Sequence, residues 1–462
     1  MVFKGYLNFL NASSYKLRRS NSESTCMKKW DRSFPEIIAP YHKVVLSIEF
    51  GHILSWINPR ASARVDYTLV GLDISQNDLV TFTIIAQVVN CKPSLIIHWN
   101  SVGQINNLCL LPFDTSTPCS PSRIGWVQGG NVAVGIFQHA EQVSQRDLYS
   151  ETGVEGEWGS HWMSMYKPVL NGLCLIPNKV GKSYLTLPGS HDSGTYSMQS
   201  GWSVPWTKTQ DLDLYSQLMC GTRSLDFRTG YNPGKTGEGR FVLVHNVFET
   251  RVSLREALEL VKQFSEEHPS EIVIIDFHHF VNLKTHTFHV SQEIRDEIAT
   301  IVKENLYGML IARSNMGDTL AEIWNGKQRI IAAFNTDTQD ERICFGVQQL
   351  WAGSSVTLKP QLKEFIGYTL SNQLHMGAFS SVETVLPAIL PISSEVIERK
   401  FWVPTLTPEV SLWYNPGSNW ALKSNIIAVD FIERTNLPQL AITSSLLKGC
   451  NLVQVTTKQT DG

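Results

Sequence analysis

Long apolar runs and concentrated positive charge are both missing from this sequence. No stretch approaches the roughly 18 or more consecutive apolar residues that a membrane-spanning helix requires, so we expect any membrane contact to be peripheral. The 462 residues carry 39 Lys and Arg against 42 Asp and Glu, which gives a net charge of −3. Nucleic-acid binding demands clustered Lys and Arg, and the chain has no basic stripe. We therefore exclude nucleic acid as the main partner.

Closely spaced cysteines of the metal-binding kind are lacking as well, while a bridge between Cys109 and Cys119 stays open. The eight cysteines are scattered, with no C-x-x-C pair and no Cys/His spacing typical of zinc sites, so we expect no thiolate-bound metal. The apolar part of the N-terminus is too short for a good secretory signal, and polar residues follow soon. This favours a cytoplasmic protein, although Asn11-Ala-Ser13 matches the glycosylation tripeptide and leaves secretion open.

The first third of the chain has the rhythm of an all-β domain. Residues 1–40 are rich in Ser, Lys and Arg and are predicted to form a poorly ordered lead-in. Residues 41–169 contain short alternating or apolar runs separated by Asn, Gly, Ser and Pro, which is typical of an antiparallel β-sandwich. We predict an accessory domain here, and its protein partner stays unknown.

Residues 170–462 alternate between strand and helix. Ser253 followed by Glu256 predicts a capping box for a first helix, and an apolar stripe predicts a second helix over 291–306. Eight strands are predicted, which is the number that a TIM-type (β/α)8 barrel needs. Their ranges are 183–187, 222–226, 241–245, 271–278, 329–334, 350–352, 401–403 and 426–430. The long segment 370–399 leaves the helix assignments there open, and an irregular barrel is one form of this expectation.

Chemically useful side chains follow three of these strands. An apolar run ends at each of three places, which are Leu187-Pro-Gly-Ser-His-Asp-Ser193, Asp226-Phe-Arg228 and His245. The carboxyl ends of parallel strands meet at one rim, and side chains two apart on a strand share a face. A lone His or Asp at a strand end is more often structural, but the joint pattern predicts two imidazoles, two carboxylates and one guanidinium that together cleave a phosphodiester.

These motifs, in this order, resemble the X domain of phosphatidylinositol-specific phospholipase C, over about residues 179–447. The resemblance is greatest to the X domain-containing proteins and the bacterial enzymes. It implies that His191 is the general base for the inositol hydroxyl and His245 the general acid for the leaving diacylglycerol oxygen. It implies that Arg228 holds the phosphate, that Asp226 orients His245 or Arg228, and that Asp192 is the bacterial-type residue after the base.

The resemblance extends to weaker candidates. Asp430 resembles a last-strand aspartate that bonds the general base and fixes its tautomer. Asp276 and His278 share a strand face, near a position where bacterial members contact substrate. Four tryptophans are further candidates: Trp351 and Trp413 for stacking on a sugar or filling the core, and Trp202 and Trp206 for docking on a membrane or packing in the core.

The resemblance also implies an activity without a metal or other cofactor. Calcium needs about six to eight oxygen ligands, and Arg228 stands where a metal-dependent relative would place another acid. The expected activity is cleavage of phosphatidylinositol-type lipids to diacylglycerol and a cyclic inositol phosphate, with phospholipid at a membrane surface as the partner. Two alternatives stay open. The first is a catalytically silent lipid-headgroup-binding or adaptor protein. The second is a glycerophosphodiester phosphodiesterase, although the metal-binding acids and the His-Arg pair that begin the site of that family are lacking around Ser190-His191-Asp192.

Overall fold

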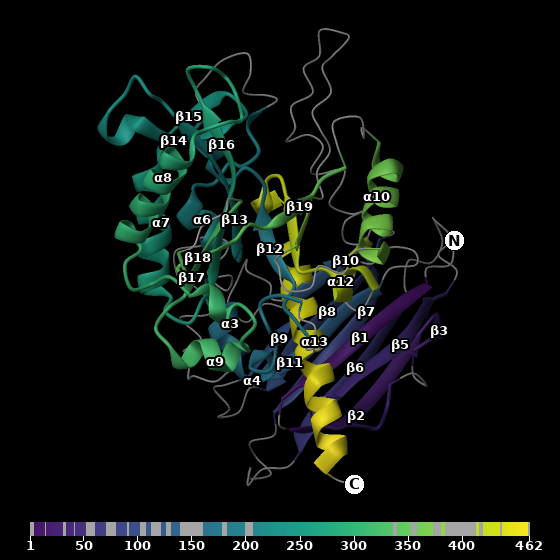
Figure 1. The fold of residues 1–462 in the computed structure, drawn as a ribbon. Helices are drawn as coiled ribbons and strands as arrows, with labels where there is room; N and C mark the ends of the chain where they lie inside the picture. Colours follow the sequence, from purple (N-terminus) through teal and green to yellow (C-terminus); the bar gives the residue numbers. More distant parts are fainter. Residues whose placement is uncertain are drawn as a thin grey trace, which may run out of the picture.

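Figure 1 shows two parts, an N-terminal pair of β-sheets and a larger α/β unit, with a long C-terminal helix running from one to the other. The fold is that of a computed structural model. It describes residues 4–13, 15–30, 34–40, 42–51, 61–70, 80–89, 92–101, 108–111, 122–125, 131–138, 160–177, 183–198, 207–335, 340–352, 358–372, 380–383, 413–414, 419–434 and 437–460.

The N-terminal part consists of two sheets of short strands. In order across the first sheet lie β3 (Met27–Lys29), β5 (His42–Phe50), β1 (Lys4–Ala12), β11 (Asn131–Gln138) and β9 (Leu108–Leu111). Across the second lie β10 (Ser122–Gly125), β8 (Lys92–Ser101), β7 (Thr81–Val89), β6 (Ser62–Val70), β2 (Lys16–Thr25) and β4 (Ile37–Ile38).

The two sheets share one apolar core. The ring of Phe9 on β1 lies 5.3 Å from that of Tyr67 on β6 and 5.8 Å from that of Phe82 on β7, centroid to centroid. On β6 the buried residues Ala63, Val65, Tyr67 and Leu69 recur with period two, as expected of a strand with one face on a core.

The prediction of a poorly ordered lead-in over residues 1–40 is wrong, because β1 lies in the middle of the first sheet and β2 inside the second. Strand β2 has only Leu17 buried, so its sequence lacks an alternating apolar signal. Its pairing with β6 determines its conformation instead. The expectation of purely antiparallel pairing is also wrong at one ladder, since β1 and β11 run parallel.

The α/β part is built on eight parallel strands. In order they are β18 (Ile343–Phe345), β17 (Ile330–Phe334), β16 (Val273–Asn282), β13 (Ser224–Tyr231), β12 (Leu187–Ser190), β21 (Ile426–Val429), β20 (Ser380–Glu383) and β19 (Gln348–Leu350). The first and last of this order, β18 and β19, are consecutive in the chain. Within the described ranges no ladder joins them, so closure of the barrel stays a prediction.

One predicted barrel strand is not a barrel strand. Residues 241–245 form β14 (Phe241–His245), which pairs antiparallel with β13 and with β15 (Phe248–Ser253). Strand β13 continues to Tyr231, and the chain then turns back along it. Strands β18 and β20, which we did not predict, belong to the parallel set, and the predicted strand 401–403 lies outside the described residues.

Helices flank this sheet, and the two that the sequence predicts most clearly are confirmed. Ser253 caps α7 (Leu254–Glu267) by accepting the backbone N–H of Glu256, and α8 spans Gln292–Asn305. The others are α3 (Trp162–Met165), α4 (Lys167–Leu170), α6 (Leu214–Met219), α9 (Leu320–Asn325), α10 (Lys359–Asn372), α12 (Asn419–Lys423) and α13 (Leu437–Thr460). No helix in the described part of the chain is both long and apolar enough to cross a membrane.

Candidate active site

The turn after β12 carries the first pair of site residues. The backbone N–H of His191 donates to the carbonyl of Val429 at 3.0 Å, which continues the ladder with β21 by one residue. Asp192 follows with φ 43° and ψ 57°, a left-handed conformation that Asp tolerates better than most residues. Because the chain changes direction here, the side chains of His191 and Asp192 lie at the carboxyl ends of the strands.

The contacts of His191 fix its protonation. Its Nε2 lies 2.9 Å from Nη2 of Arg228, and its Nδ1 lies 2.7 Å from Oδ1 of Asp430. An arginine N–H only donates, so Nε2 is the acceptor and carries no proton. The ring proton is therefore on Nδ1, where it is donated to Asp430. In this neutral tautomer Nε2 carries a lone pair that faces Arg228.

Arg228 is held between two buried carboxylates. Its Nε lies 2.6 Å from Oδ1 of Asp192, and its Nη2 lies 3.2 Å from Oδ2 of Asp226. The same Asp226 oxygen accepts the backbone N–H of Asp192 at 3.0 Å. The guanidinium side chain keeps 12% of its surface exposed, whereas that of Asp192 keeps none. The cation therefore faces solvent on one side and its counter-charges on the other.

His245 reaches the same cluster by way of the β13–β14 hairpin. Because β14 runs back along β13, its last residue returns to the level of the rim. Nδ1 of His245 lies 2.6 Å from the carbonyl of Thr207 and 3.3 Å from Oδ2 of Asp192. A carbonyl only accepts, so Nδ1 bears a proton. The rings of His191 and His245 are 6.2 Å apart, with an interplanar angle of 79°.

Burial and neighbouring charge lower two pKa values in this cluster, those of Asp226 and His278. Burial raises the pKa of Asp226, but the charge of Arg228 outweighs that effect, so its pKa lies well below the ordinary value and the carboxylate is ionised. Burial lowers the pKa of His278 to about 4, which Asp226 opposes and His279 reinforces. At neutral pH the cluster therefore combines an ionised Asp226 with a neutral imidazole at position 278.

Three of these side chains are also metal-ligand types. His191, Asp192 and Asp226 each offer an atom, and these atoms lie within 4.8 Å of one another. However, the guanidinium of Arg228 lies within 3.2 Å of both carboxylates and already neutralises part of their charge. A divalent cation at this place would face a fixed positive charge, so the donor set fits arginine better than calcium.

Comparison with known proteins assigns this region. Residues 185–333 match the family model described as phosphatidylinositol-specific phospholipase C, X domain. PI-PLC X domain-containing protein 1 of Mus musculus is 25% identical over 347 residues, covering 68% of this chain and 93% of that protein. The human protein of the same name is 26% identical over 297 residues, covering 57% and 87%. Over residues 185–333 this chain is therefore similar in sequence to that X domain.

Two solved structures also match. The phosphatidylinositol-specific phospholipase C of S. aureus is 16% identical with a TM-score of 0.47, over 62% of this chain and 97% of that one. The enzyme from Listeria monocytogenes is 18% identical with a TM-score of 0.40, over 62% of this chain and 98% of that one.

Sequence reasoning missed the segment that holds the X-domain site together, residues 207–210. Nε2 of Gln210 donates to the carbonyls of His191 at 2.9 Å and Val429 at 3.0 Å, and its Oε1 accepts the N–H of Ile432 at 3.1 Å. Oγ1 of Thr209 donates to the carbonyl of His191 at 2.9 Å. Gln210 and Thr209 are fully buried. The sequence shows a run of polar residues at this place but does not show that they are buried.

Other predicted residues of the X domain have different places. Asp276 accepts from Nε2 of Gln349 at 2.9 Å and lies 3.8 Å from Nδ1 of His278, so it belongs to the wall of the site. Trp351 is 53% exposed at the end of β19. Trp413 is 6% exposed and packs edge-on against Trp420, so the alternative of core packing is the one found.

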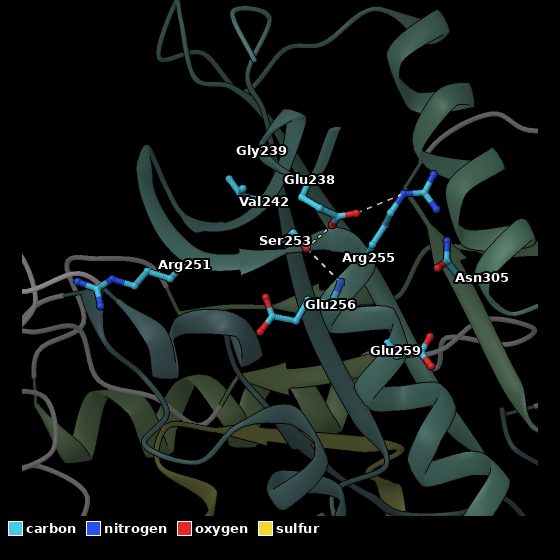
Figure 2. Close-up of a pocket in the computed structure, with 9 residues that line it drawn as sticks. All are labelled: Glu238, Gly239, Val242, Arg251, Ser253, Arg255, Glu256, Glu259 and Asn305. Carbon is cyan, nitrogen blue, oxygen red and sulfur yellow. Dashed lines mark hydrogen bonds and ion pairs between the residues drawn. The ribbon is translucent and has the colours of Figure 1, made fainter. Parts of the chain in front are cut away.

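Trp202 and Trp206 lie outside the described residues, so their predicted docking role stays a prediction. A separate open pocket lies beside the β14–β15 hairpin and the start of α7, and Figure 2 shows the residues that line it. Its volume is about 580 Å³. Its charged lining is largely paired, since Ser253 donates to Glu238 at 2.7 Å and Arg255 lies 4.0 Å from the same carboxylate. None of the predicted site residues lines it.

Proposed function

We propose that this chain is a phosphodiesterase that cleaves phosphatidylinositol-type glycerophospholipids to diacylglycerol and a cyclic inositol phosphate. The observation that carries the proposal is the pair of imidazoles with ring centroids 6.2 Å apart. Nε2 of His191 lies 2.9 Å from the guanidinium of Arg228, and His245 contacts Asp192, the carboxylate that Arg228 also contacts. General bases, general acids and a fixed cation are the three groups that phosphodiester cleavage by a neighbouring hydroxyl requires.

The first step is attack of the inositol hydroxyl next to the phosphate. Arg228 leaves Nε2 of His191 and donates instead to the non-bridging phosphate oxygens, where a fork of N–H groups stabilises the charge that builds up. His191 then takes the hydroxyl proton on Nε2 as the new P–O bond forms. Asp430 accepts the N–H at Nδ1 at 2.7 Å and stabilises the resulting imidazolium.

The second step is departure of the diacylglycerol oxygen. His245, protonated on both nitrogens, donates its Nε2 proton to that oxygen as the old P–O bond breaks. The carbonyl of Thr207 orients the ring, and the carboxylate of Asp192, 3.3 Å from Nδ1, stabilises its charged form. His191 gains one proton and His245 gives one up, so the number of protons on the protein is the same before and after the reaction.

No metal is needed in this scheme, because the guanidinium fills the position of a divalent cation. Its Nε and Nη2 lie 2.6 Å and 3.2 Å from the carboxylates that would otherwise bind calcium. We therefore expect turnover to survive chelation of calcium and magnesium.

The test is a mass-spectrometric product assay on phosphatidylinositol vesicles in EDTA. Wild type should release cyclic inositol phosphate, and His191→Ala should lose about 10² to 10⁴ in rate. Arg251→Ala, at an exposed position on β15, is the control and should keep wild-type activity. Absence of cyclic product from the folded wild type, or restoration of activity only by added calcium, would contradict the proposal.

A further inference from the structure

The strands that carry His191 and Asp430 meet over a very short ladder. β12 and β21 pair through four residues each, and His191 and Asp430 follow as the next pair in the same register. Few side chains in this ladder can fix the register, since Pro188 has no N–H and Gly189 has no side chain. A slip by two residues would separate the two site residues by about 6 to 7 Å along the strands. Contacts outside the ladder therefore matter for the register.

A serine on α13 fixes the amino end of β12. Thr186, the residue before this strand, donates its backbone N–H to Oγ of Ser445 at 2.9 Å, and the same Oγ donates to the carbonyl of Thr186 at 2.8 Å. One hydroxyl thus pairs both backbone groups of Thr186, as a neighbouring strand would. Both residues are fully buried, so water does not replace these bonds if the hydroxyl is removed.

The amino end of β21 is tied to the same place. The carbonyl of Ser424, two residues before β21, accepts the hydroxyl of Thr186 at 3.0 Å and Nζ of Lys448 at 2.9 Å. A chain of hydrogen bonds therefore runs from Ser445 through Thr186 to Ser424 and back to α13 at Lys448. It links the starts of both strands to one helix.

Lys448 is costly at this position. Its side chain is buried, and Nζ lies 4.3 Å from the ring centroid of Tyr184. Burial lowers the pKa of its amine well below the ordinary value, and no acidic group in the described part of the chain offsets this effect. A buried amine without a counter-charge lowers the stability of the fold. Its contact with Ser424 gives this lysine a purpose that stability does not.

Helix α13 is itself firmly held. It contacts α4 and β12 in the α/β part and β1 and β5 in the N-terminal part, and it can be followed between the two in Figure 1. Its residues Ile442 and Leu446 lie in the same apolar core as Leu187 of β12. At Gly449 a Cβ atom would collide with the carbonyl oxygen of Val169 on α4, so the two helices meet backbone to backbone. A helix fixed in this way can hold two strands in register.

We propose that Ser445 and Lys448 are positioning residues for the general base. By fixing the amino ends of β12 and β21, they set the register that holds Oδ1 of Asp430 2.7 Å from Nδ1 of His191. The inference rests on the proposed function in calling His191 the base, whereas the contact between the two side chains does not depend on that role. Ser445 and Lys448 act through the strands, from the ends opposite the site.

The test combines proton NMR of the full chain, labelled with isotopic histidine, with the pH profile of kcat/KM on phosphatidylinositol vesicles. In wild type, the Nδ1 proton that His191 donates to Asp430 should give a far-downfield resonance, which His191→Ala lacks. Ser445→Ala and Lys448→Met should each shift this resonance upfield. Their kcat/KM should fall on the order of 10 to 10² fold. The acidic limb of the profile should move to lower pH, because a base that is less well paired with Asp430 is protonated less readily.

Ser444→Ala is the matched control, because the buried hydroxyl of Ser444 bonds the carbonyl of Leu440 in its own helix. This variant should keep both the resonance and the profile of wild type. Lys448→Met should melt at or above the wild-type temperature, because an apolar side chain replaces a buried amine. Its loss of rate is then not a loss of folded protein.

The possible outcomes separate positioning from activity. An unchanged resonance in both folded variants, its absence from wild type, or a fall in rate without movement of the acidic limb overturns the positioning role. A resonance that depends on Ser445 and Lys448 in a chain that makes no cyclic product supports positioning and overturns the proposed function alone.

Discussion

Two arginines, one just before β13 and one within it, show how the same side chain serves two purposes. Arg223, just before the strand, is fully buried, and its Nε, Nη1 and Nη2 all donate, with Glu271 as the charged partner at 2.6 Å. Glu271 in turn accepts the N–H groups of Met163 and Ser164. This ion pair ties the connector between the two parts of the chain to the amino end of the sheet.

Arg228, five residues further along the chain and inside β13, has partners that can change. One of them, His191, is a neutral imidazole, and the two carboxylates are shared with the backbone of Asp192 and with His245. A fully matched buried ion pair is rigid, whereas a cation held by titratable groups can be redirected to a substrate. The difference assigns stability to Arg223 and chemistry to Arg228.

The largest expected effect that tests the contrast between Arg223 and Arg228 is a loss of stability. Arg223→Ala leaves the carboxylate of Glu271 buried without its cation, so the free energy of unfolding should fall by about 3 to 5 kcal/mol. Chemical denaturation monitored by tryptophan fluorescence measures it. Turnover per folded molecule should stay near wild type. A loss of turnover in the folded protein, without loss of stability, would reverse the two assignments.

The matching substitution of Arg228 should affect rate and leave stability unchanged. Arg228→Lys keeps a positive charge but loses the fork that contacts two phosphate oxygens, so kcat should fall by about 10² to 10³. The melting temperature should stay within a degree or two, because the group is partly exposed and lysine preserves the charge balance with Asp192 and Asp226. Steady-state kinetics on phosphatidylinositol vesicles, beside a thermal melt, measure both quantities.

The sequence could predict this site because its residues come from short motifs at strand ends. The order of Ser190-His191-Asp192, Asp226-Phe-Arg228 and His245 is enough to indicate that these side chains converge. The sequence could not show that His245 arrives on an antiparallel hairpin, because a run of apolar residues does not encode strand direction. Nor could it pair Arg223 with Glu271, 48 residues later, since a buried ion pair depends on tertiary contact.

The same limit applies to the N-terminal sheets and to Gln210. Strand β2 is polar along most of its length and is a strand only because β6 and β4 lie beside it. Gln210 reads as a loop residue, yet it bonds the backbone on both sides of the His191–Asp430 pair. Local sequence patterns predict helices, strands and the chemically active residues at strand ends. The polar contacts that position these residues depend on which distant segments of the chain come together in the fold.

The smallest expected effect compares two imidazoles, one beside each arginine. His268 has its pKa lowered to about 4 by burial and then by His161 and Arg223; His278 has its pKa lowered to about 4 mainly by burial. Both folded-state values lie below the ordinary value of about 6.5, so the unfolded chain binds protons that the folded chain does not as pH falls from about 6.5 to 4. Stability therefore decreases over that window.

Substitution of either ring by glutamine removes its share of this acid sensitivity. Wild type should lose unfolding free energy when the pH falls from neutral to about 5.5. For His268→Gln and for His278→Gln, this loss should be smaller by on the order of 1 kcal/mol. Denaturant titrations at the two pH values measure the loss. Only His278→Gln should also change the pH profile of kcat, because His278 lies beside the acids of the active site whereas His268 packs on Phe264 below the sheet. An altered kcat profile in His268→Gln would mean that the surroundings of the two arginines are coupled, and the separation of stability from chemistry along this strand would fail.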